Sequence, residues 1–590
     1  MSAEQLITKH LDIWTSAYKT RSAAGRGSSN KLDLYGIKKL RELILELAVR
    51  GKLVPQEPTD EPAIMLLSKI EIEKKRLEKE GVLKTSANEF IDKSEYYIDL
   101  PNGWEFARLG NLAKFIDYRG KTPTKVAEGI PLITAKNVRF GYIDREPREY
   151  ITEIEYQDWM TRGYPKLNDL LFTTEAPLGN VAVIDIEEKF ALAQRVICFQ
   201  LHDPKLAKFL RIAIMSKGFQ EQLDANATGM TATGVKSSKL KEIPVFIPPL
   251  AEQNRIVTKV DELMAFCDEL EQAQTDNIAA HAQLVEALLT TLTNSKDHQE
   301  LQANWQRIDE HFDTLFTTED SIDQLKQTIL QLAVMGKLVP QDPNDEPANE
   351  LLKKIAAEKA QMLKEGKIKK EKPLQAISDE EKPFDLPVAW EWVKLGAVTT
   401  GMDSGWSPAC LANNSPSDDV WGVLKTTSVQ VMQYLEFENK ELPKNLNPRP
   451  DAEVKTGDIL FTRAGPMNRV GISCFVQRTR PKLMISDKII RFHPVEIGIS
   501  GRFITLCLNA GATAKFLESA KSGMASSQVN ITQANLCVAP IPIPPLNEQN
   551  RIVAKIDEIV AVCESLKIKI QHSQVTKVAL ADSLSLETIG

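Results

Sequence analysis

The sequence predicts an α+β fold that is built twice, with one globular domain in each half of the 590-residue chain. Three observations predict this fold. Long motifs return about half a chain later, the middle of each half carries short β-leaning runs, and an amphipathic helical pattern follows each of these regions. A solenoid needs three or more repeats, so two large copies indicate a pseudo-two-fold molecule instead.

Five paired motifs carry the internal repeat. Their offsets are 285, 286, 289, 294 and 296 residues in chain order, a slow drift that small loop insertions explain. The closest pair is "IPPLAEQNRIV" from Ile247 and "IPPLNEQNRIV" from Ile543, which agree at ten of eleven positions. The other pairs are "LAVRGKLVPQEPTDEPA" with "LAVMGKLVPQDPNDEPA", "DLPNGWEFARLG" with "DLPVAWEWVKLG", "DLLFTTEAPLGNV" with "DILFTRAGPMNRV", and "TGM" with "SGM".

Each half begins with two helices joined by an extended linker. In the first half, apolar residues spaced three and four apart between Leu40 and Ala48 predict a helix that Gly51 ends. Pro55 keeps "KLVPQ" extended. An acidic first turn that contains Pro62 predicts a second helix, which ends near Gly81. Its charged face, "EIEKKRLEKE", is interpreted as a solvated surface, with a docking surface as the alternative.

The periodicity changes from about Asp99 to Ile247. Short β-leaning runs alternate with turn residues, and "LAKFLRIAIMSKGFQEQL" predicts one helix among them. The second half has "FITLCLNAGATAKFLESA" at the equivalent place. This region of about 150 residues has the size of one α+β domain.

A long amphipathic helix is expected after each globular domain, and the first is expected to run for about 40 residues. Its apolar seam suits packing against another helix, as in a coiled-coil spacer between the repeats. The alternative is that each helix covers only its own domain. The seam residues are Ile256, Val257, Val260, Leu263, Met264, Cys267 and Leu270, and then Ile552, Val553, Ile556, Ile559, Val560, Cys563 and Leu566.

These patterns divide the chain into five regions: an N-terminal helical region (1–98), a first domain (99–250), a central helical spacer (251–384), a second domain (385–546) and a C-terminal spacer helix (547–590).

Composition favours a cytoplasmic protein. No stretch approaches the ~20 consecutive apolar residues of a membrane span, and the N-terminus lacks a secretory pattern. The seven cysteines are odd in number and have no CxxC spacing, so neither a disulfide framework nor a zinc cluster is expected. The net charge of −7 argues mildly against a surface covered in nucleic-acid contacts, although residues 119–145 and 478–491 are locally basic.

The search for catalytic motifs favours binding over chemistry. "RGKTP" lacks the first glycine of a phosphate-binding loop, and no GxGxxG follows a strand. Both proline pairs read "IPPL", without the polar and aromatic residues of a methyltransferase's base-holding turn. No metal-ligand spacing is present among the histidines. Two similar domains held apart by a spacer suit duplex DNA, where successive major grooves lie ~34 Å apart.

Taken together, the doubled "IPPLxEQNRIV", "GKLVPQ…DEPA" and "DLPxxW" motifs resemble the specificity subunit of type I restriction–modification systems, over nearly the whole chain. The resemblance implies two target-recognition domains, each reading one half of a split, asymmetric DNA site. It also implies an antiparallel coiled-coil spacer that recruits two modification subunits, which methylate adenine. Restriction subunits with translocase and nuclease activity join them. S-adenosylmethionine, ATP and Mg²⁺ would belong to these partners, and this chain would be non-catalytic and hold no cofactor.

Candidate DNA-binding residues are the polar and basic ones in segments that differ between the repeats. Trp406 and Lys425 approximately match Lys121 and Lys136. Asn137 is a candidate for pairing with adenine. Base readout, phosphate contact and plain solubility stay open for each basic residue. The repeated Trp104 and Trp390 are expected in the core. The candidates are Arg119, Lys121, Thr122, Lys136, Asn137, Arg139, Thr174, Asn180, Lys236, Lys239, Trp406, Lys425, Thr426, Arg463, Asn468, Arg469, Gln528 and Asn530.

Two rival functions stay open at the level of sequence. One is a fused DNA methyltransferase with unrecognised motifs, against which the missing cofactor loop counts. The other is an adaptor that binds only protein.

Overall fold

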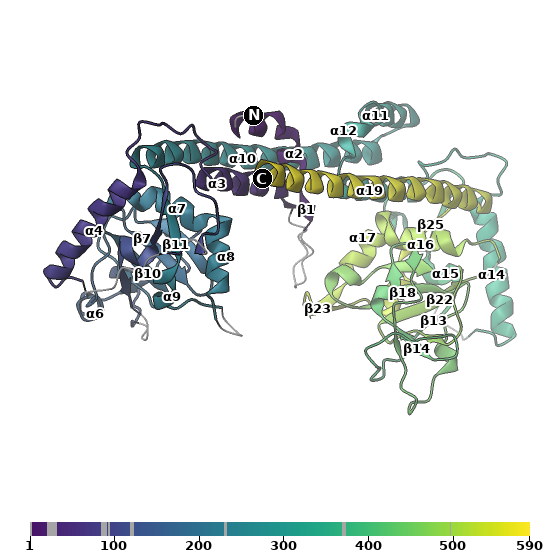
Figure 1. The fold of residues 1–590 in the computed structure, drawn as a ribbon. Coiled ribbons are helices and arrows are strands. Elements are labelled where there is room, and N and C mark those ends of the chain that lie inside the picture. Colours follow the sequence, from purple (N-terminus) through teal and green to yellow (C-terminus); the bar gives the residue numbers. More distant parts are fainter. Residues whose placement is uncertain are drawn as a thin grey trace. The chain divides into compact units, whose positions relative to one another are not determined.

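The computed structural model describes residues 3–20, 32–83, 91–92, 95–118, 123–228, 233–368, 373–495 and 497–589. The chain forms two compact units: unit 1 comprises residues 1–278 and 573–590, and unit 2 comprises 279–572. Two long helices, α10 (Leu250–Asn294) and α19 (Leu546–Ile589), each begin in one unit and end in the other (Figure 1). The end of each long helix therefore completes the unit in which the other one begins.

The domain of unit 1 contains an antiparallel four-stranded sheet in the order β4-β10-β7-β8. A three-stranded sheet, β6-β5-β9, and a β3–β11 pair adjoin it. The strands are β3 (Glu105–Arg108), β4 (Ala113–Asp117), β5 (Ile130–Ile133), β6 (Tyr150–Ile151), β7 (Leu170–Thr174), β8 (Leu178–Val183), β9 (Ala191–Leu192), β10 (Val196–Leu201) and β11 (Pro244–Ile247). The helices are α5 (Leu109–Leu112), α6 (Glu153–Trp159), α7 (Ala207–Met215), α8 (Lys217–Ala225) and α9 (Ser237–Glu242).

The domain of unit 2 repeats this topology as sheets β13-β22-β18-β20 and β17-β14-β21 and the pair β12–β25. It adds the hairpin β15–β16 and the small sheet β19-β24-β23. The main strands are β12 (Glu391–Lys394), β13 (Thr399–Ser404), β14 (Gly422–Leu424), β17 (Asn439–Glu441), β18 (Ile459–Thr462), β20 (Ser473–Phe475), β21 (Leu483–Met484), β22 (Ile489–Pro494) and β25 (Pro540–Ile543). The added strands are β15 (Val429–Gln430), β16 (Gln433–Tyr434), β19 (Ala464–Gly465), β23 (Ser522–Ala525) and β24 (Gln528–Asn530), and the helices are α15 (Leu395–Val398), α16 (Gly501–Asn509), α17 (Gly511–Ser519) and α18 (Gln533–Cys537).

The helical elements before each domain also come in matching order. Unit 1 has α1 (Ala3–Lys9), α2 (Leu11–Ser16), the strand pair β1 (Lys19–Thr20) and β2 (Leu32–Asp33), α3 (Tyr35–Val49) and α4 (Ala63–Lys79). Unit 2 has α11 (His298–Glu310), α12 (Phe312–Leu315), α13 (Glu319–Val334) and α14 (Ala348–Lys364). The predicted paired helices are thus α3 with α4, and their repeats are α13 with α14.

A glycine ends the helix at the same point in both units. Gly51 and Gly336 have φ of +63° and +72°, in the left-handed region that favours glycine. A Cβ atom at either position would lie 2.6 Å from the ring of a proline, Pro101 or Pro387. The paired motifs "GKLVPQ" and "DLP" are therefore packed against each other in each unit.

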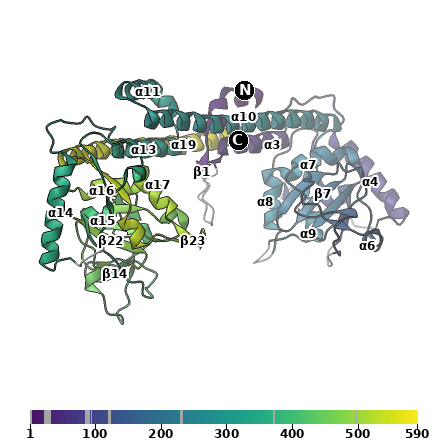
Figure 2. The same ribbon diagram turned by 180° about the vertical axis from the view of Figure 1, so that it is seen from behind.

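The seams of the long helices are buried within both units. In unit 1, Ile256, Val260 and Cys267 share a core with α3 and with Ala581 near the end of α19. Both views show α3 beside that end of α19 (Figures 1 and 2). In unit 2, Cys563 shares a core with α13 and with the last turns of α10, such as Leu289. Each long helix thus packs on its own repeat first and on the other repeat's helices at its end.

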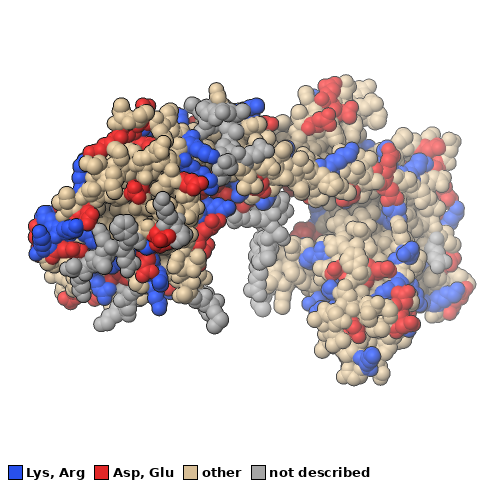
Figure 3. Space-filling view, viewed as in Figure 1, with Lys and Arg blue, Asp and Glu red and all other residues tan. Residues whose placement is uncertain are grey.

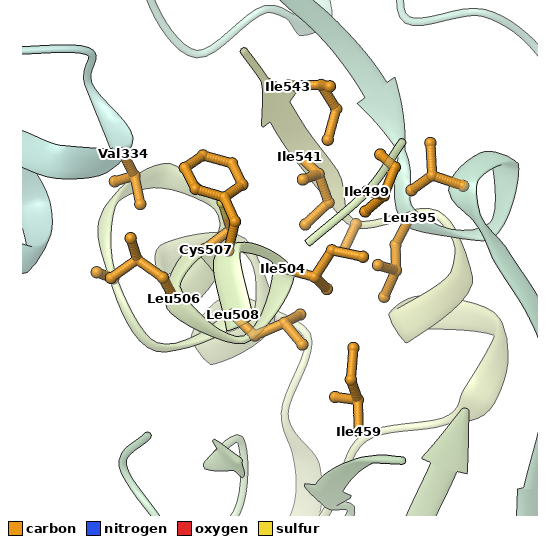
Figure 4. Close-up of a cluster of buried hydrophobic side chains, with 14 of the residues drawn as sticks. Val334, Leu395, Ile459, Ile499, Ile504, Leu506, Cys507, Leu508, Ile541 and Ile543 are labelled. Carbon is orange, nitrogen blue, oxygen red and sulfur yellow. The ribbon is translucent and has the colours of Figure 1, made fainter. Parts of the chain in front are cut away.

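The core of the second domain shows how the layers join. Ile459 of β18, Ile504 of α16 and Ile541 of β25 point into one cluster, in which Val334 of α13 also lies (Figure 4). All four side chains are at most 2% exposed. The domain and the helix before it therefore form one hydrophobic core.

The helix predicted within each domain is interrupted. In the first domain it divides into α7 and α8 at Ser216, whose backbone is extended with ψ of 151° and whose hydroxyl caps α8 by accepting from Phe219 N–H. In the second domain it divides into α16 and α17 at Ala510, which is also extended. The apolar spacing continues across the break, so periodicity alone did not reveal it.

The predicted fold class is confirmed: the chain is a doubled α+β protein with two globular domains and long helices. Among the residues that the structure describes, no helix is both long enough and apolar enough to span a bilayer.

Candidate nucleic-acid interface

Residues of three of the five doubled motif pairs meet at one anchor in each unit, where the domain joins its long helix. In unit 1, Trp104 Nε1 donates to Glu252 Oε2 at 3.0 Å, and Arg255 pairs with Asp60 at 2.6 Å. Trp104 and Glu252 are only 5% and 1% exposed. Gln253 donates to the carbonyl of Pro248, which ties the first turn of α10 to the preceding strand. Trp104 is therefore a core residue, as expected.

Unit 2 reproduces this anchor contact by contact. Trp390 Nε1 donates to Glu548 Oε2 at 3.1 Å, Gln549 donates to the carbonyl of Pro544, and Arg551 pairs with Asp345 at 2.7 Å. Burial raises the pKa of both anchor carboxyls, Glu252 and Glu548, above the ordinary glutamate value. These anchor residues thus hold each domain on its long helix.

Three of the predicted segments of the first domain meet at a loop cluster, here called the first corner (residues 134–140, 173–181 and 233–236). Asn180 Nδ2 donates to the carbonyl of Val138 at 2.9 Å. Val235 N–H donates to the carbonyl of Thr174 at 3.1 Å. Thr174 is buried in β7 and holds this cluster rather than facing outward.

The second domain has the equivalent second corner (residues 425–430, 462–470 and 522–530). The guanidinium of Arg469 donates to the carbonyls of Thr426 and Val429 at 2.8 and 2.9 Å, and to Gln430 Oε1 at 3.2 Å. Burial lowers the pKa of Arg469. Its side chain is therefore committed to positioning the loop.

The β-strands that the second domain adds continue this corner. Arg463 Nε donates to Asn530 Oδ1 at 3.4 Å, and Met467 N–H donates to the carbonyl of Ser526 at 2.9 Å. Gln528 on the same hairpin is exposed, as is Asn468 in the loop. The hairpin therefore brings exposed amide side chains to the loop that Arg469 holds.

Hydrogen bonds at the two corners show which residues of the two domains correspond. Asn180 and Arg469 are equivalent in the motif and bond to the carbonyls of Val138 and Val429, so these two valines correspond. Counting back, Thr134 corresponds to Lys425 and Lys136 corresponds to Thr427. The approximate match of Lys425 with Lys136 was therefore wrong by two residues, because the intervening segments differ in length.

Asn137 holds the first corner together. It is 1% exposed, and its Nδ2 donates to the carbonyls of Asp144 and Pro147, each at 3.1 Å. Its Oδ1 accepts from Thr134. A side chain with both polar atoms bonded inside the loop does not face a base, so the structure does not fit the predicted contact with adenine.

The other candidates fall into exposed and paired groups. Lys136 and Lys236 are exposed. Three lysines or arginines pair with carboxylates: Arg139 with Asp144 at 3.1 Å, Lys239 with Glu242 at 2.8 Å, and Lys425 with Glu438 at 3.3 Å. Trp406 is half-buried beneath the guanidinium of Arg449. The predicted residues Arg119, Lys121 and Thr122 lie outside the described residues.

The sequence motifs did not single out Arg449 as a single residue, nor Gln430 within its candidate segment. Neither lies in a doubled motif, and only the folded chain brings Arg449 to Trp406. On the face seen in Figure 3, basic and acidic side chains are interspersed over each domain. Among the described residues, no group of three or more His, Cys, Asp or Glu side chains is placed to bind a metal ion.

Known proteins match this chain over its whole length. The family model described as "Type I restriction modification DNA specificity domain" matches residues 101–280 and 387–573. The EcoEI type I restriction enzyme specificity subunit of Escherichia coli is 48% identical, with 99% of each chain covered. The EcoAI specificity subunit, also from E. coli, is 39% identical over 99% of each chain. A solved structure titled as a study of type I R-M complex assembly matches with a TM-score of 0.48 and 19% identity, covering 83% of this chain and 99% of that one. With the family model matching both domains and a full-length relative at nearly half identity, this chain belongs to the family of type I restriction–modification DNA specificity subunits.

Proposed function

We propose that the two domains each read one half of a bipartite, asymmetric DNA site on behalf of a type I restriction–modification complex. The observation that carries this proposal is a contrast between buried and exposed positions. The anchors are repeated contact by contact, whereas exposed corner residues such as Lys136 have different counterparts, here Thr427. Two readers held in the same way but carrying different side chains suit two different half-sites.

The long helices set the distance between the half-sites in this proposal. Helix α10 spans 45 residues, about 67 Å for an unbroken α-helix. Its end is fixed in unit 2 by apolar packing and by Lys337, whose Nζ donates to the carbonyls of Thr293 and Ser295 at 3.1 and 2.8 Å. In this proposal α10 sets the spacing because it begins in unit 1 and ends in unit 2.

The partners in this proposal are those that the family implies. The helical parts recruit two modification subunits, which carry S-adenosylmethionine and methylate DNA, and restriction subunits that use ATP and Mg²⁺ join the complex. The chain itself is non-catalytic in this proposal. Methyl transfer to DNA by the purified chain alone would instead support the rival function of a fused methyltransferase.

Methylome sequencing of a host that expresses the chain with its modification subunits tests the proposal directly. The expected result is one methylated motif with two defined halves and a fixed gap. Replacing residues 99–249 with the same region of another family member should change one half only, because Glu252 and Arg255 of α10 and Asp60, which hold the domain on its helix, lie outside the exchanged segment. A change in both halves would contradict the assignment of one half-site to each domain. A complex without any sequence-dependent footprint would favour a protein-only adaptor.

A further inference from the structure

An arginine stacked on a tryptophan stands out in the second domain. The guanidinium carbon of Arg449 lies 4.4 Å from the centroid of the Trp406 ring. Trp406 is half-buried and packs against the cluster around Val423 and Met484, while Arg449 is exposed. Stacking on an aromatic face holds the planar guanidinium in one orientation and leaves its N–H edges available.

The backbone around Arg449 is fixed, whereas its guanidinium has no acidic partner among the residues that the structure describes. The backbone N–H of Arg449 contacts Met484 Sδ at 3.2 Å, and its backbone carbonyl accepts from the N–H of Ala452 at 3.0 Å. Prolines on both sides further restrict the chain. In the described part of the molecule, Arg449 forms no ion pair, and the nearby Glu453 carboxylate accepts from Lys482 N–H instead. A positioned but uncompensated guanidinium is suited to an external acceptor.

A short backbone segment links the tryptophan of the stack to the second corner. The backbone N–H of Trp406 donates to the carbonyl of Ile485 at 3.2 Å, and the backbone N–H of Arg463 donates to the carbonyl of Lys488 at 2.9 Å. The short segment 485–488 therefore links Trp406 to the corner loop that contains Arg463.

Among the described residues of the first domain, the counterpart of Arg449 is not a cation. Lys166 and Lys455 correspond, because their N–H groups donate to the equivalent buried Asp169 and Asp458, both at 2.8 Å. The residue six positions before Lys166 is Met160, which is 1% exposed. The residue six positions before Lys455 is Arg449. The stacked arginine is thus a difference between the domains at an exposed position, as a specificity residue requires.

We propose that Arg449 reads a guanine in the half-site of the second domain, donating two N–H groups to O6 and N7 in the major groove while Trp406 holds its plane. Paired donors on guanine are the commonest specific contact of arginine with DNA. This inference rests on the proposed function, because it requires the second domain to face one half-site. Arg449 acts on the base directly, whereas Trp406 is a positioning residue.

The test uses the full chain assembled with its modification subunits and the site found by methylome sequencing. Binding is measured to duplexes that carry every single-base substitution in the second-domain half-site. In R449A, discrimination at one G·C position should fall roughly five- to 150-fold while the other positions are unchanged. R449K keeps the charge but not the paired donors, so it should lose the same discrimination. Trp406→Phe keeps a ring beneath the guanidinium and should lose less.

Lys444→Ala is the matched control, because Lys444 is an exposed cation five residues before Arg449 in the same loop. It should leave base discrimination intact. A uniform loss of affinity in R449A that R449K restores would show a phosphate contact and overturn the inference, as would unchanged binding by a folded R449A complex, checked by its thermal unfolding. If the wild-type complex itself showed no sequence preference, the proposed function would fail before this inference is reached.

Discussion

The two domains are the same at their anchors and different at their corners. At the anchors, tryptophan, glutamate, glutamine, arginine and aspartate repeat with hydrogen-bond lengths that agree within 0.2 Å between the units. At the corners, an asparagine that makes one bond to the loop in the first domain is replaced by an arginine that makes three in the second. The repeated anchor residues hold each domain on its helix, whereas the differing corner residues belong to the candidate DNA-reading surface.

The largest expected effect is at the anchor tryptophans. Trp104→Ala and Trp390→Ala should each destabilise their own unit by about 3–5 kcal/mol, because each opens a cavity and leaves a buried glutamate without its donor. Hydrogen exchange measured separately over the two units checks this. Unequal losses of stability would mean that the equivalent contacts contribute differently in the two units.

The second effect concerns the one position at which the junction motifs differ. Asn547 donates to Asp345 Oδ1 at 3.0 Å, in addition to the pair between Asp345 and Arg551, whereas its counterpart Ala251 has no side-chain donor for Asp60. Asp345→Ala should therefore destabilise unit 2 by about 2–3 kcal/mol. Asp60→Ala should destabilise unit 1 by about 1 kcal/mol less, because the second hydrogen bond to Asp60, from Arg255, is long at 3.4 Å. Asn547→Ala, followed by chemical denaturation, should remove that difference. If it did not, the extra hydrogen bond would contribute nothing.

The third effect tests the corners. Arg469→Ala leaves three acceptors without their donor and should destabilise the second domain by about 1–2 kcal/mol, whereas Asn180→Ala removes one bond and should cost about 1 kcal/mol. In the assembled complex, Arg469→Ala should weaken recognition of one half-site only. Arg469→Lys should not rescue it, because an ammonium lacks the planar fork that reaches two carbonyls and an amide. Rescue by lysine would indicate that only the charge matters.

The smallest effect depends on pH and should be alike in both units. Burial raises the pKa of Glu252 and Glu548 above the ordinary value near 4.5, although hydrogen bonds from Trp104 and Trp390 oppose the shift. The folded chain then takes up these protons before the unfolded chain does as the pH falls. These two groups therefore increase stability as the pH falls from above the folded pKa towards 4.5.

The double variant Glu252→Gln with Glu548→Gln keeps an acceptor for each tryptophan but cannot titrate. When the pH is lowered from 7 to 5, the stability of the wild type should increase more than that of this variant. Thermal unfolding of both proteins measures this difference. A variant that followed the wild type across this range would show that the anchor carboxyls do not titrate there.

The parts of the fold that rest on repetition and periodicity could be predicted. Two matching motifs define a repeat, and an apolar seam such as Ile256, Val260 and Cys267 defines a helix face, because burial of that face is what forms the helix. Glycines such as Gly51 ended helices as expected, because only the left-handed backbone fits there.

The corner residues were harder to predict for a physical reason. Asn137, Thr174 and Arg469 are polar residues in loops, which is the pattern of a ligand-binding residue as well as of one that satisfies loop carbonyls. Which of the two applies depends on contacts between segments that are distant in the sequence. Arg449 was missed for the converse reason, since its stacking partner stands 43 positions earlier.

The packing of the end of α19 on unit 1 has a consequence for synthesis. Ala581 is fully buried in the core around α3, and Tyr35 donates to Asp582 at 2.8 Å. Most of unit 1 is synthesised first, but its core stays incomplete until the last segment of the chain has been made. With 294 residues between Ile278 and Ser573, that delay is roughly 15–60 s at usual translation rates. A message cut short before this segment would yield a chain whose first domain is entire but whose first unit exposes apolar surface, which marks such products for chaperones and proteases before they can bind DNA.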